Sequence, residues 1–146
     1  MTDITKVYDS LDTAYEIIVK RYLTIDENNI DAALIRHSAD FAFMGAVTAH
    51  AKLLSDEFEL ELDKYEFSLR DTKSKELVSK GIRATKDAVD TATMSDPELL
   101  AKRKQQIRLA HKYNLAKNIL SSMEHQKDML VQISSNRRSE MKLHTH

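Results

Sequence analysis

Apolar residues recur every three or four positions along this chain, and the longest such run lies between residues 30 and 75. Its members step by four and three in alternation, which is a 3.5-residue period. They are Ile30, Leu34, His37, Phe41, Met44, Thr48, Ala51, Ser55, Phe58, Leu62, Tyr65 and Leu69. This period predicts one long helix over 30–75 that packs lengthwise along a partner helix.

A second run with the same steps predicts another long helix over 96–138. Its members are Leu109, Tyr113, Ala116, Leu120, Met123, Lys127, Leu130 and Ser134. Two start signals precede it: Ser95 and Glu98 have capping-box spacing, and Asp96 can instead cap a helix that begins with Pro97. Two long helices of similar length predict an antiparallel hairpin.

Shorter elements complete a single all-α domain over 1–146. The pattern predicts an N-terminal helix within 1–24, capped by Thr2 or Asp3, and a short linking helix over 84–94. Between the long helix and the short one, Gly81 can end a helix in the left-handed conformation. The tail 139–146 is expected to fray.

The helix predicted over 30–75 carries a second apolar stripe on another face: Ala42, Ala46, Ala49, Leu53, Leu60 and Phe67. Two apolar faces need two neighbours, and the second neighbour is either a helix of the same bundle or another subunit. Because two extended helices carry more apolar surface than one chain can cover, we expect an oligomeric helical assembly. The residues expected at its contacts are Phe41, Met44, Phe58, Leu62, Leu109, Leu120, Met123 and Leu130.

Charge is distributed unevenly along the chain. The net charge is −1, but residues 1–69 have a balance of −8, residues 70–117 a balance of +6 and residues 118–146 a balance of +1. A basic helix stripe can follow a phosphate backbone without reading bases, although it can also be an ordinary solvated face. The candidate DNA-binding residues are Arg83, Lys86, Lys102, Arg103, Lys104, Arg108 and Lys112.

Catalytic and metal-binding patterns are missing from the sequence. It has no cysteine, and its two glycines, Gly45 and Gly81, cannot form a phosphate-cradling loop. No Glu-x-x-His motif is present, and His37 with Asp40 is a weak metal pair. We therefore expect no enzyme, no metal and no cofactor.

No segment predicts a membrane location. The most apolar stretch, 39–54, contains Asp40, His50 and Lys52 and is too short to cross a bilayer. The first residues lack the basic start and apolar run of a signal peptide. We expect a cytoplasmic protein.

Three segments resemble phage recombination mediators, the UvsY-like proteins. They are 36–42 (RHSADFA), 82–89 (IRATKDAV) before Ser95-Asp96-Pro97-Glu98, and 124–138 (EHQKDMLVQISSNRR). The resemblance covers roughly residues 30–140 and implies an all-helical, ring-forming homo-oligomer without a cofactor. It also implies a protein that binds single-stranded DNA and loads a phage recombinase onto strands covered by single-strand-binding protein.

One departure from the family affects the expected site. Some members carry a basic cluster in the first long helix, whereas the matching region here, Asp56 to Glu66, is acidic. The DNA contact is therefore expected between Arg83 and Lys112. The leading hypothesis is a phage recombination mediator in the cytoplasm of an infected bacterium. The alternative is a helical structural or interaction protein, such as an assembly factor or an inhibitor of a host protein, and a hydrolase or metalloenzyme is a weak third.

Overall fold

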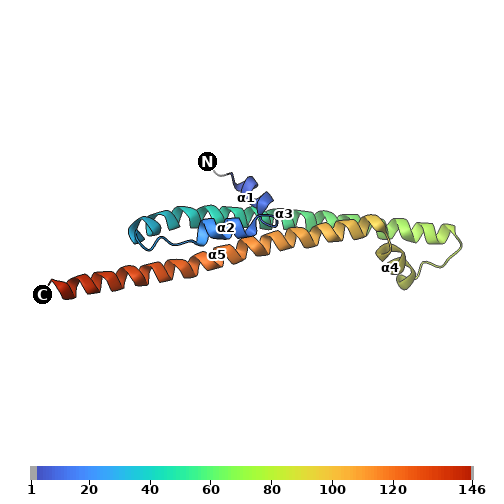
Figure 1. The fold of residues 1–146 in the computed structure, drawn as a ribbon. Helices are drawn as coiled ribbons and strands as arrows, with labels where there is room; N and C mark the ends of the chain where they lie inside the picture. Colours follow the sequence, from blue (N-terminus) through green and yellow to red (C-terminus); the bar gives the residue numbers. More distant parts are fainter. Residues whose placement is uncertain (1–2, 146) are drawn as a thin grey trace. The chain divides into compact units, whose positions relative to one another are not determined.

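The computed structural model describes residues 3–145, and every regular element within that range is a helix (Figure 1). In chain order these are α1 (Ile4–Ser10), α2 (Tyr15–Leu23), α3 (Ile30–Ser79), α4 (Lys86–Met94) and α5 (Pro97–His144). The all-α class and the two long helices are confirmed, since α3 has 50 residues and α5 has 48. The expectations for residues 1, 2 and 146 lie outside the described range.

The chain forms two compact units, and both long helices contribute to each of them. Unit 1 is Met1–Ala51 with Lys112–His146, and unit 2 is Lys52–His111. The sequence predicts one domain over 1–146 because the chain has the length of a single domain, whereas the boundaries between the two units lie within α3 and α5. The division therefore falls inside continuous helices and leaves no mark in the pattern of residues.

In unit 1, α1 and α2 pack on the first part of α3 and the last part of α5. The Tyr8 ring of α1 lies edge-on to His50 of α3, with 5.2 Å between centroids, and the Tyr22 ring of α2 stacks with Phe43 at 6.2 Å. The apolar core around these contacts is formed by Val7, Tyr8, Leu11, Ile18, Tyr22, Ile30, Met44, Val47, Ala51, Ala116, Ile119, Met123 and Leu130.

The single N-terminal helix expected from the sequence is in fact two helices. α1 ends at Ser10, whose hydroxyl donates to the Lys6 carbonyl at 2.8 Å, and α2 begins at Tyr15. The residues between them include Asp12 and Thr13, which favour turns over helix because their side chains compete for backbone hydrogen bonds. The break also buries Leu11 completely.

Three polar contacts join the end of α2, the α2–α3 connection and α3 to α5 within unit 1. The His37 Nε2 atom lies 2.7 Å from the Met123 carbonyl oxygen, so this nitrogen carries the proton and donates. Gln126 donates from Nε2 to the Leu23 carbonyl at 2.9 Å, and Arg137 donates to the Glu27 carbonyl at 2.8 Å. The bonds to Leu23 and Glu27 satisfy backbone carbonyls at and after the end of α2 and fix the chain's approach to α3.

In unit 2, α3 continues beyond the predicted end at residue 75 and stops at Ser79. The polar stretch remains helical because Lys75 pairs with Asp71 at 2.9 Å and Lys73 with Glu76 at 3.5 Å, one helical turn apart. The helix then ends as the sequence predicts, at Gly81 with φ of 73°. The amides of Gly81 and Ile82 donate to the Val78 and Leu77 carbonyls at 3.0 and 2.9 Å, which is a Schellman motif.

α4 and α5 are separated by only two residues, and each residue caps a different helix. The Ser95 hydroxyl donates to the Thr91 carbonyl at the end of α4, at 2.7 Å. The Asp96 carboxylate accepts from the Leu99 amide at 3.0 Å, with Pro97 as the first residue of α5. Of the two predicted starts, the Asp96 cap is therefore the correct one.

α5 extends six residues beyond the predicted end at Arg138, so residues 139–144 of the tail are helical rather than frayed. Residues 139–144 contain neither glycine nor proline, and Glu140, Met141, Lys142 and Leu143 are good helix formers. The Ser139 hydroxyl bonds to the Ser135 carbonyl at 3.2 Å without breaking the helix.

Candidate nucleic-acid interface

Three of the seven predicted DNA-binding cations are engaged inside the chain. The Arg103 guanidinium lies 3.0 Å from the Glu66 carboxylate in unit 2. The Lys102 ammonium lies over the Tyr65 ring at 4.9 Å from its centroid, and the Lys112 ammonium over the Tyr8 ring at 4.6 Å. All three side chains are half-buried, so their first role is to attach α5 to its neighbours.

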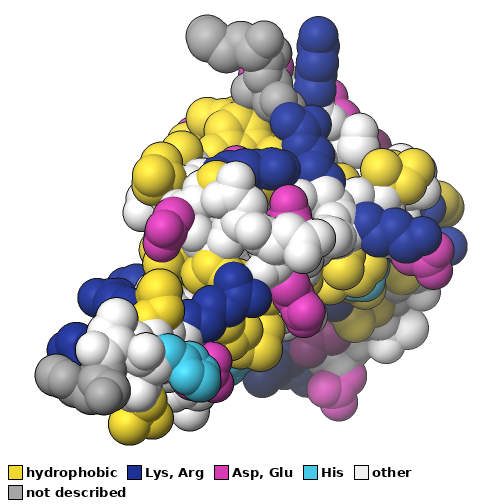
Figure 2. Space-filling model, turned by 60° about the vertical axis from the view of Figure 1, so that its left-hand side comes forward, with side chains coloured by type: hydrophobic (Ala, Val, Ile, Leu, Met, Phe, Trp, Pro, Cys, Tyr) yellow, Lys and Arg dark blue, Asp and Glu magenta, His cyan; other side chains and the backbone are white. Residues whose placement is uncertain are grey.

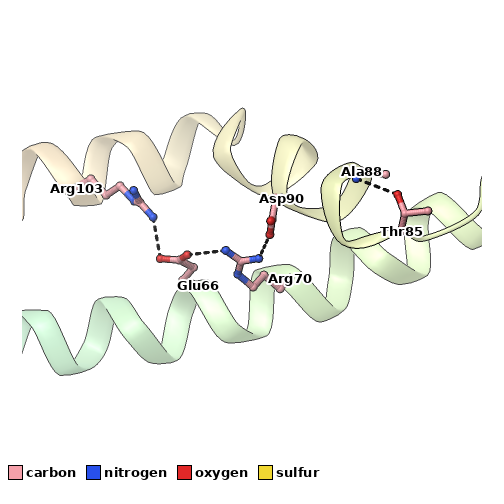
Figure 3. Close-up of polar contacts among 6 residues, drawn as sticks. All are labelled: Glu66, Arg70, Thr85, Ala88, Asp90 and Arg103. Atoms are coloured by element: carbon pink, nitrogen blue, oxygen red, sulfur yellow. Dashed lines mark hydrogen bonds and ion pairs between the residues drawn. The ribbon is translucent and has the colours of Figure 1, made fainter.

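Other positive charges of the basic middle segment are also neutralised within unit 2. Arg70 bridges Glu66, at 3.2 Å, and Asp90 of α4 (Figure 3). Lys73 lies 3.9 Å from Asp96. The +6 balance of residues 70–117 therefore overstates the positive charge that is open to a partner.

Glu66 is the centre of this network. Burial raises the pKa of its carboxyl group, but the hydrogen bonds from Arg103 and Arg70 lower the pKa more, and the net shift is downward. Beside it, burial, a hydrogen bond to Glu98 and the charge of Asp96 raise the pKa of Tyr65 to about 12. The Tyr65 hydroxyl therefore stays a neutral donor, 3.3 Å from the Asp96 carboxylate.

The remaining four predicted cations are exposed, and within residues 3–145 none of them has a hydrogen-bond or ion-pair partner. They form two groups. Arg83 lies in the connection between α3 and α4 and Lys86 begins α4, and Lys80 of the same connection is exposed as well. Lys104 and Arg108 lie one helical turn apart on α5.

We call Lys80, Arg83 and Lys86 the turn cluster. No acidic residue lies between Lys80 and Lys86, and all three side chains are open to solvent. Lys80 belongs to the basic segment of the sequence but is missing from the predicted site, because a polar run near a helix end resembles a solvated terminus. Lys80 directly precedes Gly81, and the Schellman turn at Gly81 lies between Lys80 and Arg83.

Four of the eight residues predicted at subunit contacts lie in the chain's own core. Met44 and Met123 are fully buried, and Leu62 and Leu130 nearly so. The other four, Phe41, Phe58, Leu109 and Leu120, are half-buried. The first apolar stripe of α3 is therefore covered within one chain.

The second stripe of α3 is left uncovered. The side chains of Leu53, Leu60 and Phe67 are 53%, 58% and 78% exposed. On α5, Leu100 and Ile107 are 47% and 68% exposed. Figure 2 shows one face of the molecule, on which apolar side chains reach the surface among charged ones.

A hollow of about 290 Å³ in unit 1 lies beside the connection between α2 and α3. Its charged lining residues include Arg36 and Asp40, which pair with each other at 3.1 Å. In the part of the chain that the structure describes, no group of three or more acidic, histidine or cysteine side chains could hold a metal ion. No helix in the same range is long and apolar enough to cross a membrane.

Comparisons with family models, with curated proteins and with solved structures find no match for this chain. The resemblance to UvsY-like proteins therefore depends on the sequence segments alone. In the structure these segments lie within α3 (36–42), across the α3–α4 connection and α4 (82–89), and within α5 (124–138).

Proposed function

We propose that this chain is a phage recombination mediator or accessory protein that binds single-stranded DNA as a homo-oligomer. In this proposal its long helices form an antiparallel hairpin. The protein acts in the cytoplasm of an infected bacterium and helps to load a recombinase onto strands covered by single-strand-binding protein. The observation that carries the proposal is the turn cluster, because its three cations are exposed and unpaired within the described residues. The resemblance to UvsY-like proteins supports the same function.

The chemistry of the turn cluster suits a phosphate backbone. Lysine and arginine side chains that neutralise phosphates release condensed counterions, which supplies affinity without reading the base sequence. Three cations per chain give only weak binding. Several copies on one strand add their contacts, because each further contact is made at high effective concentration.

A triple charge reversal tests this site. We expect Lys80→Glu, Arg83→Glu and Lys86→Glu together to weaken binding to oligo-dT and to flatten its salt dependence. The slope of log affinity against log salt should fall by about 2 per chain, because each phosphate contact with a single strand contributes about 0.7. Fluorescence anisotropy at a series of salt concentrations measures both quantities.

The matched control reverses three exposed lysines elsewhere, Lys20→Glu, Lys127→Glu and Lys142→Glu. This control changes the net charge by the same amount as the turn-cluster variant. A loss of oligo-dT affinity in the turn-cluster variant alone therefore assigns the DNA contact to that cluster. Equal losses in both variants would show that only the overall charge matters. Salt-sensitive binding that survives the turn-cluster reversal would refute this site.

The uncovered apolar residues of α3 favour a second candidate function. A helical assembly or interaction protein needs exposed apolar stripes such as Leu53, Leu60 and Phe67 and has no need of DNA. Light scattering combined with a gel shift on oligo-dT separates the two. An oligomer that leaves DNA unshifted at low salt supports this second function and contradicts the first.

A further inference from the structure

Two exposed apolar stripes in unit 2 have the same axial spacing. The α3 stripe consists of Leu53, Leu60 and Phe67, and the α5 stripe of Leu100 and Ile107. Neighbours in each stripe are seven residues apart, which is about 10 Å along a helix. A seven-residue step returns to nearly the same side of the helix, with a drift of about 20°. Each stripe is therefore one continuous ridge with the spacing of a coiled-coil seam.

The charges beside the two stripes are opposite. Residues 53–67 contain six acidic residues and one cation, Lys64. Glu57, Glu61 and Asp63 are exposed there and have no ion-pair partner in the described chain, whereas Asp56 is paired with Lys52. Residues 100–108 contain four cations and no carboxylate. Of these cations, Lys104 and Arg108 are exposed and unengaged.

We propose that both stripes are covered by further copies of this chain, with the α3 stripe of one copy packed on the α5 stripe of the next. The contact deepens the homo-oligomer of the proposed function, on which it rests. It places Leu100 and Ile107 against Leu60 and Phe67, and it brings Lys104 and Arg108 to the acidic flank of the neighbour. These two cations then serve subunit contact, and the turn cluster remains for DNA.

Charge selects this pairing over the pairing of like stripes. A two-fold contact of α3 on α3 would oppose two acidic flanks, and one of α5 on α5 would oppose two basic flanks. Like charges facing each other across an interface disfavour association. Only the α3–α5 pairing joins opposite charges. It closes as a two-fold dimer if both stripes meet the same neighbour, and as a ring if each stripe meets a different one.

A complementation experiment tests the pairing directly. One variant carries Leu100→Lys and Ile107→Lys, which disables the α5 stripe, and the other carries Leu60→Glu and Phe67→Glu, which disables the α3 stripe. We expect each alone to sediment as a single chain, and an equimolar mixture to form a one-to-one dimer and nothing larger. The exposed Ile17→Glu is the control and should associate as the parent does.

Several outcomes would overturn the proposal. Self-association of either variant alone at the parent's concentration would indicate that like stripes pair or that a different surface is used. Failure of the mixture to dimerise, with both variants helical by circular dichroism, would also contradict the α3–α5 contact. If the parent is itself a single chain, the homo-oligomer of the proposed function fails as well. If the parent is an oligomer, only this contact fails, and the DNA test of the turn cluster stands unaffected.

A charge swap gives an independent readout on the same faces. Lys104→Glu with Arg108→Glu should raise the dissociation constant of self-association at least tenfold. Adding Glu57→Lys and Asp63→Lys in the same chain should restore association, because the two flanks are then exchanged in sign. If the first two substitutions weaken self-association and the second two fail to restore it, the proposed pairing is contradicted.

Discussion

Glu66→Ala is expected to lower the free energy of unfolding by about 2 kcal/mol. The Glu66 carboxylate accepts from Arg70 at 3.2 Å and from Arg103 at 3.0 Å, and its side chain is 22% exposed. Hydrogen bonds to charged groups contribute about 1.5–3 kcal/mol when buried, whereas exposed ion pairs contribute about 0–1 kcal/mol. Partial burial places each of these two bonds at about 1 kcal/mol.

Urea unfolding followed by far-ultraviolet circular dichroism measures this loss. The protein concentration is held fixed at pH 7, because self-association would add to the apparent stability. Glu59→Ala is the matched control, since Glu59 is an exposed carboxylate of the same helix that has no ion-pair partner among residues 3–145. A Glu66→Ala midpoint equal to that of Glu59→Ala would refute the reasoning. A double-mutant cycle with Arg103→Ala should give a coupling of about 1 kcal/mol.

Three further predictions concern stability. The parent should unfold with a higher free energy than Glu66→Ala, and this difference should be complete above pH 4.5, the ordinary pKa of the group. The difference should disappear as the pH falls through the lowered pKa of folded Glu66, and urea midpoints across pH measure it. Gly81→Ala should lower the free energy of unfolding by about 1 kcal/mol, because φ is 73° there and a Cβ disfavours that conformation. An unchanged thermal midpoint would contradict the assignment of the turn. Met123→Ala should lower the free energy of unfolding by about 2–5 kcal/mol because Met123 is fully buried. Met129→Ala, at a residue that is 48% exposed, should change it little. Similar losses for the two variants in urea unfolding would place the core elsewhere.

Helix starts and stops were predictable where a single residue determines them locally. Gly81 and Asp96 act as the sequence predicts, because a left-handed cap and an N-cap each depend on residues within one helical turn. The break at Leu11 was missed because the apolar spacing continues across it. The extra turns at Ser79 and His144 were missed because charged, exposed stretches resemble the end of a helix even when ion pairs or good helix formers keep them helical.

The inner and outer faces of α3 could not be distinguished from periodicity. Both stripes have helical spacing, and which one α5 covers depends on contacts between residues far apart in the sequence. Met44 and Leu62 were assigned to subunit contact for this reason, although they lie in the chain's own core, and Leu60 and Phe67 are the exposed residues. The subunit contacts themselves stay a prediction.

The candidate DNA-binding residues illustrate the same limit. Exposure of Arg83 and Lys86 agrees with the polar character of their segment. The engagement of Arg103 was not predictable, because its carboxylate partner lies 37 positions away and is reached only through tertiary packing.

The two-residue joint between α4 and α5 restricts how the chain can tolerate changes in length. Each residue of an α-helix advances the side-chain direction by about 100°. One inserted residue between Ser95 and Asp96 would either turn Leu99 out of the position in which it is fully buried or pull the Asp96 carboxylate away from Lys73 and Tyr65. The connection over residues 80–85 contains no fully buried side chain. The fold should therefore accept peptide tags or insertions there, at the expense of the spacing of the turn cluster, and reject them at the α4–α5 joint.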